Sequence, residues 1–173
     1  MNHYKSEGAN TICLSQELNL TEIRDMLKYT DSEIESIVYG YTPLMISEYC
    51  PMGVLVRNCK KDKRSSICNK SLYALKDAKD GTYRLSQDIF CRTSIYNSKP
   101  LCVLEDLREL NKAGINVFRI DLTFESDEEI KSIIEAFEEC IENDFNIGMK
   151  SKKLYKEVEN TGLTSGHYYK GVE

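Results

Sequence analysis

The stretch TICLSQELNLTEIRDMLKYTDSEIESIVYG, residues 11–40, decides the fold class. Its two ends, Thr11–Ser15 and Glu33–Gly40, are short apolar runs typical of buried strands. Between them Asn19 is a suitable N-cap, and Glu22 follows three places later as its capping partner. One helical face then collects the apolar side chains Leu20, Ile23, Met26 and Leu27. This strand–helix–strand order favours a parallel sheet and therefore an α/β fold.

The same alternation returns in the second half of the chain. Ser94–Ser98 is a candidate strand, and Val103–Gly114 predicts a helix that ends at its glycine. Ile115–Thr123 is the clearest strand of the sequence, and Ser126 with Glu129 forms a capping box for the next helix. The core stripe predicted for that helix is Ile130, Ile133, Ile134, Phe137 and Ile141.

Two other segments interrupt this pattern. Residues 41–94 hold four cysteines and a charge run, so we expect a Cys-rich insertion within a single domain spanning residues 1–173. Inside it, Asp80-Gly81 predicts a hairpin with a type I′ turn. Residues 144–173 are polar and are expected to form a C-terminal tail or extension.

About four β-α units correspond to half of a TIM-like (β/α) barrel, because a complete barrel needs about 250 residues. An open four-stranded parallel sheet would expose two edges. We therefore expect a partial TIM-like barrel that is a fragment, or that another segment or chain completes.

Composition limits the functional classes. The net charge of −5 gives no reason for strong nonspecific binding to nucleic acid, although the basic run Arg57–Arg64 either contacts RNA or is simply solvated. The first residues are polar, and no apolar run approaches the ~20 residues that span a membrane. We expect a cytoplasmic protein without membrane contact, whose cysteines are reduced or metal-bound.

Four of the seven cysteines fall in or beside the insertion. Eight residues separate Cys50 from Cys59, eight separate Cys59 from Cys68, and 22 separate Cys68 from Cys91. Four thiolates suit tetrahedral zinc or a [4Fe–4S] cluster, and spacing alone does not choose between these two and four unrelated thiols. The remaining cysteines, Cys13, Cys102 and Cys140, are expected to fill the core.

Strand ends supply the other candidates, since the carboxyl ends of parallel strands face the active site of a barrel. Arg119 and Asp121 alternate with Ile120 on one predicted strand, so both side chains point to the same side. There they bind a substrate carboxylate, orient a catalytic acid or form a structural salt bridge. Glu17 either contributes to the site or stabilises the start of a helix. His167 either places an imidazole at the site or is solvated on a surface strap.

Five stretches together resemble the peptidase U32 family. They span nearly the whole chain in the family's order, and the pairing of Tyr-Gly-x-x-Pro-Leu-Met with a terminal Gly-His-Tyr-Tyr-Lys-Gly-Val is specific. The stretches are LSQELNLTEI (14–23), VYGYTPLMISEYCP (38–51), CRTSIYNSKPL (91–101), GINVFRIDLTFES (114–126) and TSGHYYKGV (164–172).

The resemblance implies the second half of a TIM-like barrel and the C-terminal extension of a long member, which lacks the N-terminal half-barrel or pairs with another chain. The family name implies a protease or collagenase-like hydrolase acting on peptides. Other members take part in oxygen-independent hydroxylation of RNA bases or of a quinone precursor, with a [4Fe–4S] cluster on four cysteines. The resemblance places that set at Cys50, Cys59, Cys68 and Cys91. A zinc-stabilised binding module without chemistry is the alternative, and we expect the segment alone to be inactive.

Overall fold

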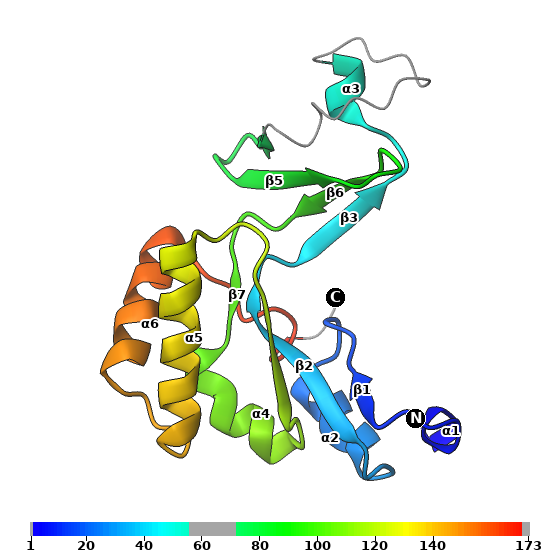
Figure 1. Cartoon of the computed structure of the whole chain (residues 1–173), viewed down its shortest axis with the longest axis vertical. Coiled ribbons are helices and arrows are strands. Elements are labelled where there is room, and N and C mark those ends of the chain that lie inside the picture. The colour runs from blue at the N-terminus through cyan, green and yellow to red at the C-terminus, as the bar shows by residue number, and fades with distance from the viewer. Residues whose placement is uncertain (1, 56–71, 171–173) are drawn as a thin grey trace. The chain divides into compact units, whose positions relative to one another are not determined.

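A computed structural model describes residues 2–55 and 72–170 and has a mixed α/β fold. The chain forms two compact units: residues 1–40 together with 99–173, and residues 41–98 (Figure 1). Two of the predicted metal ligands, Cys59 and Cys68, lie outside the described residues. Each unit has its own sheet.

The sheet of the first unit is built around one strand, β2 (Glu33–Gly40). β1 (Thr11–Cys13) and β8 (Val117–Asp121) pair with it in parallel, as the sequence predicts, on opposite edges. β7 (Leu101–Cys102) runs antiparallel and pairs with Tyr39 and Gly40, farther along the edge that β1 uses. Over the described residues these strands do not close into a barrel, so the partial barrel stays a prediction.

Two helices begin at the capping residues that the sequence predicts. In α2 (Leu20–Leu27) the Asn19 side chain accepts hydrogen bonds from the backbone at 21 and 22, and Glu22 accepts one from the Asn19 N–H. Ser126 and Glu129 cap α5 (Asp127–Glu142) in the same reciprocal way. The remaining described helices of this unit are α1 (Asn2–Ser6), η2 (Leu104–Asp106), α4 (Leu107–Ala113) and α6 (Met149–Thr161).

The core of the first unit lies between β2 and the helices α2, α4 and α5. The stripe predicted for α5 is wrong at Ile134 and Ile141, which are 38% and 43% exposed. Ala136 and Cys140 are buried beside Ile133 and Phe137 in their place, because the face that meets the core is rotated toward these positions. Cys102 is also buried.

The expectation that Cys13 fills the core is wrong, since its residue is exposed. It lies opposite Glu35 on the face of the sheet that carries polar side chains, whereas its neighbours Ile12 and Ile34 face the core. A strand with only three residues gave no alternation from which to choose the face.

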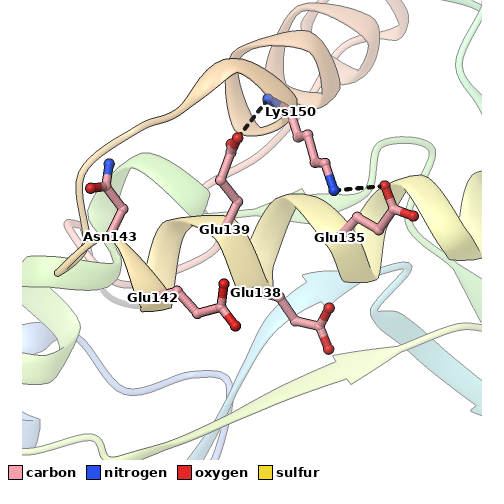
Figure 2. Close-up of a pocket in the computed structure, with 6 residues that line it drawn as sticks. All are labelled: Glu135, Glu138, Glu139, Glu142, Asn143 and Lys150. Atoms are coloured by element: carbon pink, nitrogen blue, oxygen red, sulfur yellow. Dashed lines mark hydrogen bonds and ion pairs between the residues drawn. The ribbon is translucent and has the colours of Figure 1, made fainter.

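Helix α6 lies within residues 144–173, where the sequence predicted a C-terminal tail or extension and no helix was identified. The helix starts after Gly148, which has no side chain to cap it. Glu139 of α5 supplies the cap instead (Figure 2). The Glu139 carboxylate accepts the backbone N–H groups of Lys150 and Ser151 at 3.2 and 2.9 Å and also the Ser151 hydroxyl. These hydrogen bonds lower the pKa of Glu139 and join the two helices. Because the cap comes from another helix, the sequence around Gly148 carries no local signal.

The second unit holds an antiparallel sheet in the order β3-β6-β5-β4, with the short helix α3 (Pro51–Leu55) after its first strand. The strands are β3 (Pro43–Ser47), β4 (Tyr73–Lys76), β5 (Thr82–Gln87) and β6 (Thr93–Tyr96). The predicted strand Ser94–Ser98 therefore belongs to this sheet and not to the parallel one.

The predicted hairpin is present between β4 and β5, but its type I′ turn is wrong. Five residues connect the strands, and of the central pair Asp80 has a positive φ of 64° while Gly81 does not. The Asp77 carboxylate accepts the N–H groups of Lys79 and Gly81, both at 2.8 Å, and so stabilises a longer loop.

Gly40 ends β2 at a place where only glycine fits. Its φ is +134°, and a Cβ there would approach the Asp121 carbonyl oxygen to 2.3 Å. Its backbone pairs with Leu101 on one edge and with Asp121 on the other. A side chain would therefore push β8 away from the central strand.

We predict that Gly40→Ala lowers the free energy of unfolding by more than about 1 kcal/mol, because it adds both an unfavourable φ and a backbone clash. Gly8→Ala is the matched control: its φ is +97°, but a Cβ there meets nothing within 4 Å. Urea denaturation of both variants measures the difference. Equal losses of stability would contradict the steric argument.

Candidate functional site

Two predicted metal ligands leave the second sheet at the same end. β3 ends at Ser47, which pairs with Thr93 at the start of β6, and Thr93 also pairs with Gln87 at the end of β5. Cys50 follows β3 and Cys91 precedes β6. The antiparallel register therefore brings two cysteines that are distant in sequence to one end of one sheet.

The Cys50 sulfur lies in a surrounding of hydrogen-bond donors. The Gly53 N–H donates to it at 3.2 Å and the Gln87 side-chain amide at 3.1 Å. Cys91 is exposed in the turn that joins β5 to β6, with a positive φ of 64°. The Thr93 hydroxyl is buried at the same end without a hydrogen-bond partner among the described residues.

This donor set fits a thiolate-bound metal centre. N–H groups aimed at a sulfur stabilise the negative charge of a cysteine ligand, and a buried hydroxyl without a protein partner can donate to such a centre. In residues 2–55 and 72–170, no three His, Cys, Asp or Glu side chains gather as a metal site. With Cys59 and Cys68 outside this part of the chain, the four-cysteine set stays a prediction.

A second cluster lies on the polar face of the first sheet. The Arg119 Nε donates to Asp121 Oδ1 at 2.7 Å, and its Nη1 lies 3.5 Å from Glu35 Oε1. The side chains of Arg119 and Asp121 point to one side of β8, and their ion pair is one of the arrangements that the sequence allowed. The Arg119 side chain is 47% exposed, so water screens the pair and it contributes little to stability.

Cys13 joins this cluster from β1. Partial burial and hydrogen bonding to the Glu35 carboxylate raise the pKa of its thiol, while the positive charge of Arg119 lowers it. Sequence reasoning missed Cys13 and Glu35 as site residues. The charged residues at positions 33 and 35 of this strand were the signal, because alternate residues share a face.

Glu17 and His167 lie elsewhere on the first unit. Glu17 is exposed in the turn before α2, where its backbone N–H donates to the Ser15 hydroxyl at 3.4 Å. His167 is exposed in the C-terminal segment. Nothing in these positions tests a catalytic role, which stays a prediction for both.

The residue beside His167 has a clear structural role. The Tyr168 hydroxyl is buried, lies 2.7 Å from Ser36 Oγ and donates to the Ile37 carbonyl at 2.7 Å. That carbonyl falls between the stretch of β2 that β1 pairs and the stretch that β7 pairs. It also adjoins the register shift between Ile37 and Tyr39. The tyrosine thus closes a gap in the hydrogen bonding of the central strand.

An acidic hollow on the first unit does not form a site. Figure 2 shows Glu138 and Glu142 beside the helix-capping Glu139, while Lys150 bridges to Glu135 at 3.1 Å. Glu139 and Lys150 are already used in joining α5 to α6, so this arrangement is explained by packing.

We predict that Glu35→Gln accelerates alkylation of Cys13 at pH 8. The substitution removes a carboxylate that raises the thiol pKa, so more of the reactive thiolate is present at that pH. Mass spectrometry of the peptide containing Cys13, after timed iodoacetamide treatment across a pH series, measures the shift. Glu33→Gln on the same strand is the control, and an equal acceleration by both variants would contradict the assignment to Glu35.

Comparison with known proteins adds the following. The model of peptidase family U32 matches residues 1–173. The chain is 25% identical over 184 residues to the tRNA hydroxylation protein P2 of Bacillus subtilis (strain 168), an alignment that covers 98% of this chain and 58% of that protein. The chain thus spans little more than half the length of this relative. No solved structure matches this chain. Among the described residues, no helix has the length and apolar character to cross a membrane.

Proposed function

Because this chain belongs to peptidase family U32, we propose that it forms part of a protein acting in tRNA hydroxylation. In that protein a [4Fe–4S] cluster is proposed to be held by Cys50, Cys59, Cys68 and Cys91. The family assignment agrees with the resemblance in the sequence. The reaction, the substrate and the cluster are the proposal.

One observation carries the metal assignment: the Cys50 sulfur accepts two N–H hydrogen bonds at the end of the sheet where Cys91 also lies. An amide N–H donor to the sulfur is typical of a cysteine that ligates a metal. The name of the Bacillus subtilis relative, a tRNA hydroxylation protein, supports the reaction class.

A bound [4Fe–4S] cluster supplies one-electron redox chemistry. The residues of this chain do the rest: Gly53 and Gln87 donate hydrogen bonds to a ligand sulfur, and such donors tune the reduction potential of a cluster. Arg119, with Glu35 and Asp121 beside it, offers a charged surface on which the polar groups of a substrate can be oriented.

Peptidase activity is the second candidate, and the family name favours it. Peptide hydrolysis requires an activated nucleophile or a metal-bound water. Cys13 is the nucleophile nearest to a carboxylate in the charged cluster, but its raised pKa disfavours the thiolate. The raised pKa of Cys13 therefore argues against a cysteine-dependent hydrolysis at this cluster.

The sheet edges bear on the proposed partner. In the described part of the chain, β1 and β8 each pair only with β2, which leaves their outer backbone groups to be paired elsewhere. We propose that an N-terminal half-barrel or another chain, including a second copy, completes this sheet in a cytoplasmic assembly.

We predict that protein purified without oxygen contains iron and acid-labile sulfide, and that Cys50→Ser and Cys91→Ser remove both. Elemental analysis and electron paramagnetic resonance of the reduced protein measure this. Cys13→Ser, which changes another exposed cysteine, is the control and retains the iron. Colourless protein with stoichiometric zinc would instead identify the binding module without redox chemistry.

A second prediction tests the reaction itself. In a host whose own tRNA hydroxylation gene is deleted, expression of the gene carrying this chain restores a nucleoside that contains one additional oxygen. Mass spectrometry of digested tRNA detects it. Cys50→Ser abolishes the restoration, whereas Lys131→Ala, which changes a side chain 78% exposed on α5, does not. A restored nucleoside in the Cys50→Ser strain would separate the reaction from the cluster.

A further inference from the structure

The charges of the chain are divided unequally between its two units. Residues 41–98 contain ten lysines and arginines against five aspartates and glutamates, whereas the rest of the chain contains 13 against 23. All of this basic excess lies in residues 57–70, outside the described residues; the rest of the unit carries four lysines and arginines against four aspartates and glutamates. A net acidic protein thus carries a net basic unit, and such asymmetry is typical of a unit that meets a polyanion.

The antiparallel sheet of this unit has two different faces. Gln87, Leu85 and Thr93 lie on the face where the Cys50 sulfur is bound, and Leu85 and Thr93 are buried there. The alternate residues of the same strands point the other way. We name this second side the tyrosine face and define it by Tyr41, Thr82, Arg84, Ser86, Ser94 and Tyr96; Ile46, Ala74 and Lys76 pair with members of this set and share the face.

The tyrosine face combines rings, a guanidinium and hydroxyls. The Arg84 guanidinium lies 4.5 Å from the centre of the Tyr41 ring. Next to it, the Ser86 hydroxyl donates to the Tyr96 hydroxyl at 3.3 Å. The six residues include no carboxylate, and the nearby Asp77 is bound by the N–H groups of its own loop.

We propose that the tyrosine face binds single-stranded RNA, as an anchoring surface separate from the cysteine end of the sheet. The inference rests on the proposed function in that it supplies a binding surface for an RNA substrate. Tyrosine rings and guanidinium planes stack on unpaired bases, and serine and threonine hydroxyls bond to base edges and to ribose. The Arg84 guanidinium also offers hydrogen-bond donors to a phosphate.

A protein partner fits this surface less well. The exposed Ile46 of the edge strand β3 pairs with Ser94 and lies on this face, but the central strands β5 and β6 carry polar and aromatic groups there. The core of a stable protein interface is apolar and is depleted in serine. Four-stranded sheets that display aromatic side chains are an established form of RNA-binding surface.

The test measures binding of a fluorescein-labelled, unmodified tRNA transcript to the full chain by fluorescence anisotropy over a salt series. Arg84→Ala and Tyr96→Ala are expected to weaken binding about tenfold each, because each removes a stacking group. Tyr96→Phe keeps the ring and retains most of the affinity. Tyr29→Ala and Lys131→Ala, at exposed sites of the acidic unit, leave the affinity unchanged.

Further arms keep the test decisive. Arg84→Lys conserves the charge but not the planar group, so it weakens binding at any salt concentration without changing the salt slope. This variant keeps the test informative if an alanine variant fails to fold. Duplex RNA of equal length competes poorly for a stacking surface. Unchanged affinity in Arg84→Lys and Tyr96→Ala, equal losses in the controls, or equal competition by duplex RNA would overturn the inference.

The same variants separate this inference from the proposed function. If the tyrosine-face variants lose RNA binding but the protein carries out no tRNA hydroxylation, the RNA-binding surface is supported and the proposed reaction is not. Hydroxylation that persists with unchanged RNA affinity in those variants keeps the reaction and removes the surface. Absence of tRNA binding at low salt would overturn the surface in favour of a protein partner.

Discussion

The backbone of β2 must be hydrogen-bonded along its length, because buried N–H and C=O groups without partners cost free energy. One edge is paired by β8, and the other is shared by β1, the Tyr168 hydroxyl and β7 in turn. Three segments from the start, middle and end of the chain therefore meet on one strand. This shared strand unites residues 1–40 and 99–173 in one unit.

The same strand also places the charged cluster. Parallel pairing on both sides of Glu35 brings Cys13 from β1 beside it and Arg119 from β8 within reach. The carboxylates of Glu35 and Asp121 and the guanidinium of Arg119 influence each other only because the register makes them neighbours. In the second unit, an antiparallel register does the equivalent for Cys50 and Cys91. Both candidate sites are thus consequences of strand pairing.

In two places where sequence reasoning fell short, the deciding contact was remote along the chain, and in a third it lay within one loop. Helix α6 was missed because its N-terminal cap is Glu139 of another helix. The type I′ turn was predicted from Asp80-Gly81, but hydrogen bonds to Asp77 favour a longer loop. The strand near Ser94 was correct as a strand, yet its residues alone carry no information on which sheet it joins.

The sequence by itself determined the elements whose signals are local: the capping boxes at Asn19 and Ser126, the helix end at Gly114, and the parallel strand–helix–strand start. Backbone groups and side chains within one turn satisfy each other there, so short-range patterns suffice. The tertiary structure alone decided which strands share a sheet, and which side chains share a face. Those choices depend on hydrogen bonds and burial between segments far apart in the chain, as when Tyr168 completes β2.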